Sequence, residues 1–274
     1  MKTEDSSPNP LGIAVPHSRY YHPGHLFPVD RTEGRRDIGL GETIPFGGAD
    51  VWSAYEISWL NPHGRPEVAV GRFTFPCESE NLIESKSLKL YLNSLNLERF
   101  ESMTAVQTII ARDLTEKAGA LVDVTLFRVG DLDKADIGVP PGRCLDDADI
   151  EVHSYQLDPT ILSVRPEQVE ETVHSNLLRT NCPVTGQPDW GTIVIRYQGP
   201  QIDPPGLLQY IVSYREHTGF HENCVERIFC DILKRCKPER LFVQARFTRR
   251  GGLDINPWRA NYDVEPAFVR YVRQ

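Results

Sequence analysis

The second half of this chain repeats the pattern of its first half, and this repeat is the strongest constraint on its fold. In the first half, two alternating segments around a turn rich in Pro and Gly predict a β-hairpin. Two segments with apolar residues three and four apart then predict amphipathic helices, and another alternating segment predicts a closing strand. These five segments are residues 54–60, 67–75, 82–95, 102–117 and 121–129.

The second half predicts the same order of strand, strand, helix, helix and strand. Its segments are residues 170–179, 190–197, 204–217, 222–236 and 241–249. Single residues also correspond in type and in order. The matched pairs are Tyr91 with Tyr210, Ser94 with Ser213 and, in the hairpin turns, Asn61 with Asn181, Gly64 with Gly186, Pro66 with Pro188 and Glu67 with Asp189. The shared order of elements and turn residues indicates duplication of one α+β module.

The repeat divides the chain into an arm and two modules. Residues 1–50 are rich in Pro, Gly, His and Arg, lack apolar periodicity and predict an irregular N-terminal arm. Residues 51–145 form the first module and residues 146–274 the second. An antiparallel sheet that helices cover on one face leaves its edge strands open. We therefore expect a second copy of the chain to pair with these edges, which would give a closed ring of strands and a homodimer.

Composition argues against several classes of function. A chain of 274 residues with 40% hydrophobic residues has enough material for two domains of the usual ~100–150 residues. The net charge of −8 argues against direct nucleic acid binding, since phosphate contacts require a basic surface.

No segment approaches the ~20 apolar residues of a membrane span, and residues 1–5 begin no secretory signal, which predicts a cytoplasmic protein. The six cysteines form no Cys-x-x-Cys pair, so we expect reduced thiols and no metal site.

The cysteine at position 182 distinguishes the second hairpin turn from the first, which contains none. A lone cysteine is most often an inert buried thiol, but a turn rich in Pro and Gly is a poor place for a core residue. A thiolate nucleophile needs a neighbour that exchanges a proton, and Asp189 at the far end of the turn is a candidate. The turn therefore predicts a nucleophile at Cys182.

Three further segments carry residues suited to binding. Glu84-Ser85-Lys86-Ser87-Leu88-Lys89 begins the first predicted helix with two lysines that its counterpart lacks, and such helix starts can bind phosphate. Phe220-His221-Glu222 separates the second pair of helices, and Arg249-Arg250-Gly251-Gly252 follows the last strand. A solvated helix face, a helix cap and a plain turn would also explain these segments. Each half keeps signals that the other has lost, which predicts a single site assembled between the modules.

At these residues the chain resembles the NADPH-dependent 7-cyano-7-deazaguanine reductases, the nitrile reductases of queuosine biosynthesis, in their two-module form. Residues 84–91 resemble the Glu-Ser-Lys-Ser-x-Lys signature of that family, and the resemblance covers nearly the whole chain from about residue 50. Residues 181–190 resemble the family's catalytic turn, residues 220–222 resemble its substrate-binding element, and residues 249–254 resemble its second cofactor segment. The resemblance implies tandem tunnelling-fold (T-fold) modules, whose antiparallel sheets close into a barrel on oligomerisation and bind purine-like ligands between modules.

The resemblance also implies a reaction and the residues that carry it. The nitrile of 7-cyano-7-deazaguanine would be reduced to the aminomethyl group of 7-aminomethyl-7-deazaguanine with two NADPH, through a thioimidate on Cys182. Asp189 would act as the general acid, and His221 would adjoin the reacting carbon. The residues implied to bind the substrate are Ile83, Glu84, Ser85, His221 and Glu222, and those implied to bind NADPH are Ser85, Lys86, Arg250 and Gly251.

Three other functions remain open on the residues alone. A Cys-dependent hydrolase could act on a nitrile or amidine of a purine-like base, and a binding module could carry such a base without chemistry. A zinc-dependent relative with the same fold would need a tetrahedral ligand set, which the Cys and His spacing does not offer. No Rossmann fingerprint is present, because Gly39-Leu40-Gly41 is followed at the required position by Ile44.

Overall fold

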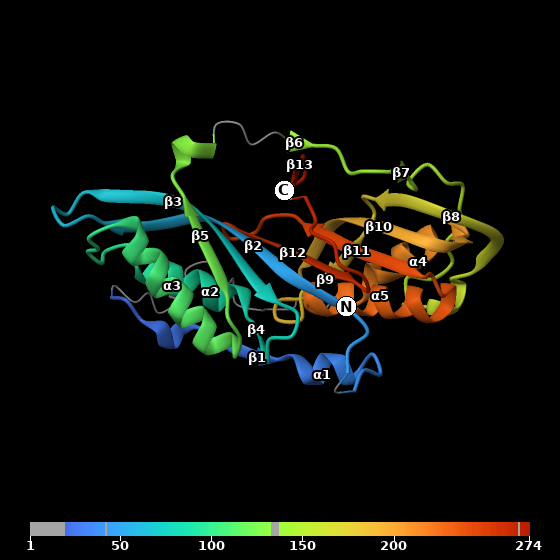
Figure 1. Cartoon of the computed structure of the whole chain (residues 1–274), viewed down its shortest axis with the longest axis horizontal. Coiled ribbons are helices and arrows are strands. Elements are labelled where there is room, and N and C mark those ends of the chain that lie inside the picture. The colour runs from blue at the N-terminus through green and yellow to red at the C-terminus, as the bar shows by residue number, and fades with distance from the viewer. Residues whose placement is uncertain (1–19, 42, 133–136, 268) are drawn as a thin grey trace, which may run out of the picture.

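One nine-stranded sheet runs through the protein and carries strands from both halves of the sequence (Figure 1). The structure is a computed structural model and describes residues 20–41, 43–132, 137–267 and 269–274. The strands lie in the order β5-β3-β2-β12-β11-β10-β8-β7, with β9 paired to β10. Their bounds are β2 Gly47–Leu60, β3 Pro66–Pro76, β5 Asp123–Phe127, β7 Arg143–Cys144, β8 Val164–Ser175, β9 Arg179–Asn181, β10 Pro188–Ile202, β11 Arg240–Phe247 and β12 Leu253–Ala260.

The structure repeats the same arrangement in each half. In each half, the second strand along the sequence lies between the third and the first, as β5-β3-β2 in the first half and β11-β10-β8 in the second. Neighbouring strands are antiparallel except for the short β7, which runs parallel to β8. Each half has two helices between its second and third strands, and in Figure 1 all four lie on the same side of the sheet. These helices are α2 Ser85–Ser94, α3 Met103–Ala118, α4 Pro204–Ser213 and α5 His221–Cys236. The predicted α+β class with an antiparallel sheet is confirmed.

Local sequence explains where these helices begin and end. The Ser102 side chain accepts a hydrogen bond from the backbone N–H of Ala105 at the start of α3, and Gly119 ends this helix with a left-handed φ of 68°. Glu84 and Asp203 cap α2 and α4 in the same way through their carboxylates. The apolar residues of each helix face the sheet, which explains why the three-and-four spacing predicted them.

Strand β12 was missed by the sequence analysis, in which the strand ending at residue 249 was the last. A turn follows β11, and β12 comes after this turn, pairing with β11 on one side and with β2 on the other. The β2 pairing extends from Leu253 opposite Ala54 to Ala260 opposite Gly47. Pro257 hides this strand in the sequence, since proline within a run argues against a central strand. We call the β2–β12 pairing the seam, because it joins the two halves into one sheet.

The N-terminal arm is more regular than predicted. Its described part contains a short strand, β1 (Pro28–Asp30), which pairs with β4 (Asn81–Ile83), and a short helix, α1 (Arg31–Arg36). These elements are too short to produce a periodic pattern, and β1 is held by a partner about fifty residues away in the sequence. Residues 1–19 of the predicted arm lie outside the described residues. The remaining short elements are η1 Pro23–His25, η2 Val129–Leu132, β6 Ile137–Gly138, η3 Pro159–Ile161, η4 Tyr214–Glu216 and β13 Arg270–Tyr271.

The predicted strand at residues 170–179 is split in two. Strand β8 ends at Ser175, the chain turns, and β9 begins at Arg179 to form a separate hairpin with β10. That hairpin carries the turn with Cys182.

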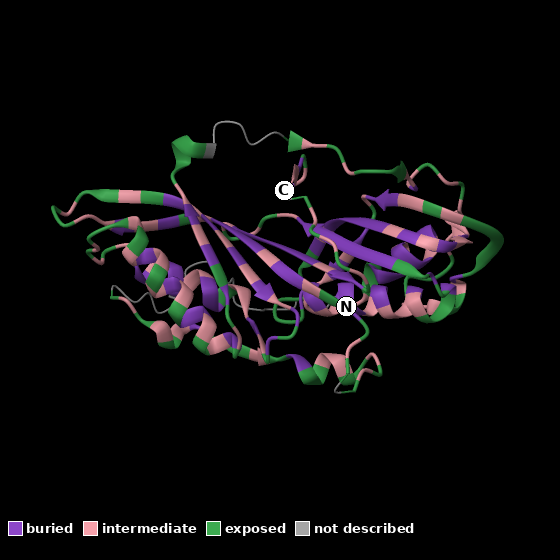
Figure 2. Cartoon of the chain, in the orientation of Figure 1, coloured by how far each residue is buried: buried purple, intermediate pink, exposed green. Residues whose placement is uncertain are grey.

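Two apolar clusters fill the space between the sheet and the helices, one beneath each half. Figure 2 shows the buried residues concentrated in the middle of the sheet and on the inward faces of the helices. The clusters exchange residues across the seam: Leu253 and Ile255 of β12 join the first cluster, while Phe46 and Cys77 join the second. Neither half therefore completes its core alone. Among the described residues, no helix combines the length and apolar character needed to cross a membrane.

We predict that the seam is sensitive to a single methyl group at Gly48. This residue has a φ of 148°, and a Cβ added there would lie 2.2 Å from the carbonyl oxygen of Trp258 in β12. Gly48→Ala should cost about 2 kcal/mol or more and lower the melting temperature by about 4–8 °C, measured by thermal denaturation. Gly47→Ala is the matched control, since a Cβ there meets no atom within 4 Å. Equal melting temperatures for the two variants would contradict this view of the seam.

Candidate active site

A pocket lies where elements of both halves meet, between the β9–β10 turn, the starts of α2 and α5, and strand β12. The first half contributes an apolar wall and the residues at the start of α2, while the second half contributes most of the titratable side chains. Its lining comprises Trp52, Ile83, Glu84, Ser85, Cys182, Pro183, Val184, Asp189, Gly219, Phe220, His221, Glu222, Arg250 and Ile255. The predicted assembly of one site from both modules is consistent with this placement.

The turn that holds Cys182 is fixed by its own backbone. The N–H of Cys182 donates to the carbonyl of Gln187 at 2.9 Å, and the N–H of Gly186 donates to the carbonyl of Cys182 at 2.9 Å. Gly186 has a φ of 66°, a left-handed conformation that glycine adopts without strain. These constraints place the Cys182 side chain against the pocket, where the residue is only 4% exposed.

The Cys182 thiol differs from the other five cysteines in its ionisation. Burial opposes loss of its proton, but hydrogen bonds from the Thr185 hydroxyl, the backbone N–H groups of Thr185 and Val184, and Arg250 hold its pKa below the usual value. Burial raises the pKa of each of the other thiols, to about 12 for Cys224. A lowered thiol pKa is typical of a reactive cysteine, so the structure distinguishes Cys182 as the most easily ionised thiol of the chain.

Asp189, in β10, lies between two nitrogen-bearing side chains. Arg250 Nη1 is 2.8 Å from its Oδ1, and His221 Nε2 is 3.0 Å from its Oδ2. The His221 ring stacks on Phe247 with centroids 3.7 Å apart and planes 5° apart. Burial lowers the pKa of His221, with only partial compensation from Asp189, so the imidazole is neutral at neutral pH. Despite the short distance, Oδ2 of Asp189 and both ring nitrogens of His221 lack an aligned hydrogen bond from a described residue, which leaves buried polar atoms for a ligand.

Glu222 lines the pocket at the start of α5. It is 2% exposed, and its pKa is raised to about 8 because burial and the charge of Asp50 outweigh its own backbone N–H and the charges of Arg31 and Arg259. The carboxyl group is therefore mostly neutral at pH 7 in the absence of a ligand. A ligand with N–H donors would favour its ionised form.

A groove adjoins this pocket on its outer side and shares Cys182, Val184, Glu84, Ser85 and Arg250 with it. The groove is otherwise lined by Lys86, Lys89, Leu90, Asn93, Thr185, Gln187, Gly251 and Leu253. Every residue to which the family resemblance assigned a role lines the pocket, the groove or both.

Two of these residues have other contacts as well. The Glu84 carboxylate accepts hydrogen bonds from the backbone N–H groups of Lys86 and Ser87, at 2.9 and 2.7 Å, and so caps α2. Lys89 forms an ion pair with Glu56. Among the described residues, no group of three or more His, Cys, Asp or Glu side chains is arranged to hold a metal ion.

Comparison with known proteins identifies the family. Residues 17–126 match the sequence model described as nitrile reductase, 7-cyano-7-deazaguanine-reductase N-term, and residues 188–266 match the one described as QueF-like protein. The chain is 55% identical over 267 residues to the NADPH-dependent 7-cyano-7-deazaguanine reductase of Desulfotalea psychrophila, covering 97% of each chain. The chain belongs to this family of nitrile reductases. The resemblance expected from the sequence motifs is thereby confirmed.

Other relatives give the same result. The NADPH-dependent 7-cyano-7-deazaguanine reductase of Azoarcus sp. is 54% identical, with 92% of this chain and 90% of that protein covered. The protein of the same name from Burkholderia multivorans is 52% identical, with 97% and 98% covered. A crystal structure of the archaeosine synthase QueF-Like in the apo form covers 37% of this chain and 99% of that chain, at 16% identity and a TM-score of 0.32, too low for a comparison of folds.

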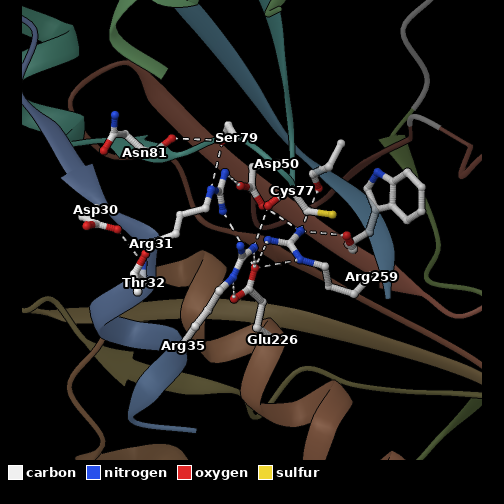
Figure 3. A network of polar contacts seen from close by, with 12 residues as sticks. Asp30, Arg31, Thr32, Arg35, Asp50, Cys77, Ser79, Asn81, Glu226 and Arg259 are labelled. Carbon is white, nitrogen blue, oxygen red and sulfur yellow. Dashed lines mark hydrogen bonds and ion pairs between the residues drawn. The ribbon is translucent and has the colours of Figure 1, made fainter. Parts of the chain in front are cut away.

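A buried charge network lies beneath the pocket of this nitrile reductase and was missed by the sequence analysis (Figure 3). Arg31 and Arg259 contact Asp50 at 2.6 and 2.8 Å, and Arg35 and Arg259 contact Glu226 at 2.8 and 2.9 Å. The five side chains come from α1, β2, α5 and β12, so no short motif contains them. Three guanidinium groups face two carboxylates, which leaves one positive charge in excess.

The network is coupled to the pocket through Glu222, which lies one helical turn before Glu226 in α5. Arg31 and Arg259 favour the ionised form of Glu222, whereas Asp50 opposes it. Buried charges are tolerated only when partners compensate their loss of hydration. The excess positive charge therefore makes ionisation of Glu222 less unfavourable than in an uncharged protein interior.

We predict a pH-dependent stability that is traceable to Glu222. Its carboxyl keeps a proton in the folded protein up to about pH 8, whereas in the unfolded chain it loses the proton near its ordinary pKa of 4.5. The folded state thus binds more protons in this range, so the contribution of Glu222 to stability is lost as the pH rises from about 4.5 to about 8. Glu222→Gln removes this titration and should raise the melting temperature, relative to wild type, more at about pH 9 than at about pH 5.

The measurement is thermal denaturation of both proteins across this pH range. Glu116→Gln serves as the control for loss of one carboxylate, because the Glu116 side chain is 71% exposed and should affect the melting temperature little at either pH. A difference between Glu222→Gln and wild type that does not change with pH would contradict the raised pKa.

Proposed function

We propose that this protein reduces the nitrile of 7-cyano-7-deazaguanine to the primary amine of 7-aminomethyl-7-deazaguanine, consuming two NADPH, as a step of queuosine biosynthesis. The observation that carries the proposal is the position of Cys182. Its thiol has a lowered pKa and lies where a buried pocket containing Glu222 meets a groove with cationic residues. Relatives that share more than half of the sequence are named for this NADPH-dependent reduction.

The pocket provides the groups that such a base requires. The pyrimidine edge of a deazaguanine presents adjacent N–H donors, and the buried Glu222 carboxylate would accept hydrogen bonds from them. Trp52, Ile83 and Phe220 supply apolar surface for the planar ring. With its edge at Glu222, the base would direct its substituent toward Cys182, which lines the same pocket together with Ser85 and Glu84.

The first step of the proposed reaction is addition of sulfur to the nitrile. The thiol proton passes to the Asp189 carboxylate, the sulfur electron pair forms the C–S bond, and the nitrile nitrogen takes up the proton from Asp189. The product is a thioimidate, whose carbon accepts hydride more readily than a nitrile carbon does. His221, neutral and with its Nε2 3.0 Å from Asp189 Oδ2, would adjoin the reacting carbon.

The groove fits the cofactor that the family names. Lys86 is exposed on its rim, Arg250 lies at its junction with the pocket, and a Cβ at Gly251 would meet only the Lys89 side chain, so a ligand can approach this backbone closely. Cationic donors of this kind bind phosphate groups. When bound, NADPH supplies hydride to the carbon held on Cys182.

Protons from water then complete the balance. After the first hydride adds, breaking the C–S bond returns the Cys182 thiolate and leaves an imine in the pocket. Asp189, which gave its proton to the nitrogen in the first step, takes a proton from water and delivers it with the second hydride. Another proton from water restores the Cys182 thiol, so two hydrides and two protons in total convert the nitrile to the amine.

We predict that the free enzyme forms a covalent adduct with 7-cyano-7-deazaguanine when NADPH is absent. Intact mass spectrometry should show a gain equal to the mass of the base, because no atoms leave when the thioimidate forms. Cys182→Ala should show no gain. Cys224→Ala is the matched control and should still form the adduct, since burial raises the pKa of the Cys224 thiol to about 12.

Two outcomes would count against this function. The absence of an adduct under conditions in which the enzyme turns over would exclude the covalent step. Ammonia release from the nitrile without cofactor would instead identify a Cys-dependent hydrolase that acts on the same base.

We also propose that the chain consists of two T-fold modules, residues 51–145 and 146–274, and that two copies of the chain form a homodimer whose sheets close into a barrel. The support is the open ends of the sheet, since β5 and the outer part of β8 have free edges among the described residues. Size-exclusion chromatography with light scattering should give the mass of two chains. A stable monomer at working concentrations would contradict the proposal.

A further inference from the structure

Arg250 contacts both side chains to which the covalent step is assigned. Its Nη2 donates a hydrogen bond to Cys182 Sγ at 3.3 Å, and its Nη1 lies 2.8 Å from Asp189 Oδ1. No motif of the sequence pointed to this pair of contacts, because the resemblance places Arg250 among the residues that bind cofactor phosphates. The guanidinium lies between the nucleophile and its proton-transfer partner before any cofactor is bound.

The backbone around Arg250 holds it in this position. The N–H of Arg250 donates to the carbonyl of Leu253 at 3.0 Å, and the N–H of Leu253 donates to the carbonyl of Arg250 at 3.1 Å. Gly251 and Gly252 complete this tight turn with φ values of 59° and 79°. The turn leads directly into β12, so the seam fixes the point from which the Arg250 side chain extends.

Several charged or titratable groups surround Cys182. They are Glu84, Lys86 and Lys89 at the start of α2, Asp189 in β10, His221 and Glu222 at the start of α5, and Arg250 in the β11–β12 turn. Among the described residues, Arg250 is the one cation with a hydrogen bond to Sγ. A guanidinium remains charged at every working pH and holds two donors in a fixed plane, so it stabilises a thiolate and keeps the adjacent carboxylate aligned.

We propose that Arg250 is a catalytic residue of the covalent step, stabilising the Cys182 thiolate and orienting Asp189, in addition to any contact with the cofactor. This inference rests on the proposed function in taking Cys182 as the nucleophile. The thiol proton passes to Asp189, sulfur bonds to the nitrile carbon, and the nitrogen takes the proton, while Arg250 itself gains and loses none. Its part is to stabilise the negative charge on sulfur until the C–S bond forms.

The experiment separates this role from cofactor binding by leaving the cofactor out. The rate at which iodoacetamide alkylates Cys182 is followed against pH, with the site of modification located by peptide mass spectrometry. Arg250→Gln should move the midpoint of this profile upward by about one pH unit and slow alkylation at neutral pH by about tenfold. Arg250→Lys, which keeps the charge but not the paired donors, should give an intermediate midpoint.

The control is Lys86→Ala, which removes a groove cation that does not contact Cys182. It should weaken NADPH binding but leave the alkylation profile and the cofactor-free adduct unchanged, whereas Arg250→Gln should slow adduct formation as well. Circular dichroism and melting temperature are used to check that each variant is folded. If Arg250→Gln is not folded, Arg250→Lys is compared with wild type in its place.

One result would overturn the inference. Folded Arg250→Gln would show the same alkylation profile as wild type, and its defect would be confined to NADPH affinity. If Arg250→Gln does not fold, the same result for Arg250→Lys would overturn the inference. Failure of the proposed function gives a different result, because the wild-type enzyme would then form no adduct with the nitrile. The alkylation profile would still report whether Arg250 controls the ionisation of Cys182.

Discussion

The pairing of β12 with β2 is the interaction on which the rest of this structure depends. It joins two copies of a three-stranded unit into one sheet and lets each apolar cluster take residues from the other half. It also places the Arg250 turn, which leads into β12, beside the start of α2 from the first half. The pocket at Cys182 exists because these two segments meet there. A duplicated chain without this seam would keep its helices and hairpins but would have no shared site.

Burial raises the pKa of both acidic groups that flank this pocket, Cys182 and Glu222, and their partners decide the outcome. Cys182 and Glu222 are both nearly inaccessible to water, yet the pKa of the thiol is lowered and that of the carboxyl is raised to about 8. Hydrogen-bond donors converge on the sulfur, whereas Glu222 lies near Asp50 as well as near arginines. The donors around sulfur thus favour a thiolate at Cys182 in spite of its burial, whereas burial keeps a proton on Glu222 until a donor-bearing ligand arrives.

Sequence reasoning predicted the repeated module, its helices and the residues of the site, because periodicity and turn chemistry are local and the site residues lie in short motifs. It missed β12, whose Pro257 and buried polar residues resemble a loop, and the regular elements of the arm, which depend on pairing with β4. The network of Arg31, Arg259 and their carboxylate partners was also missed, because its members are far apart in the chain. Features that arise only from contacts across the seam leave no local signal in the sequence.

The pocket that contains Cys182 and Glu222 is proposed to bind the base, which leaves the adjoining groove for the cofactor. A crystal structure of the protein soaked with 7-cyano-7-deazaguanine would show where the base binds. We expect continuous density between Cys182 Sγ and the former nitrile carbon, with the N–H edge of the base on Glu222. Density for the base in the outer groove, or a bound base whose nitrile points away from Sγ, would contradict this proposal.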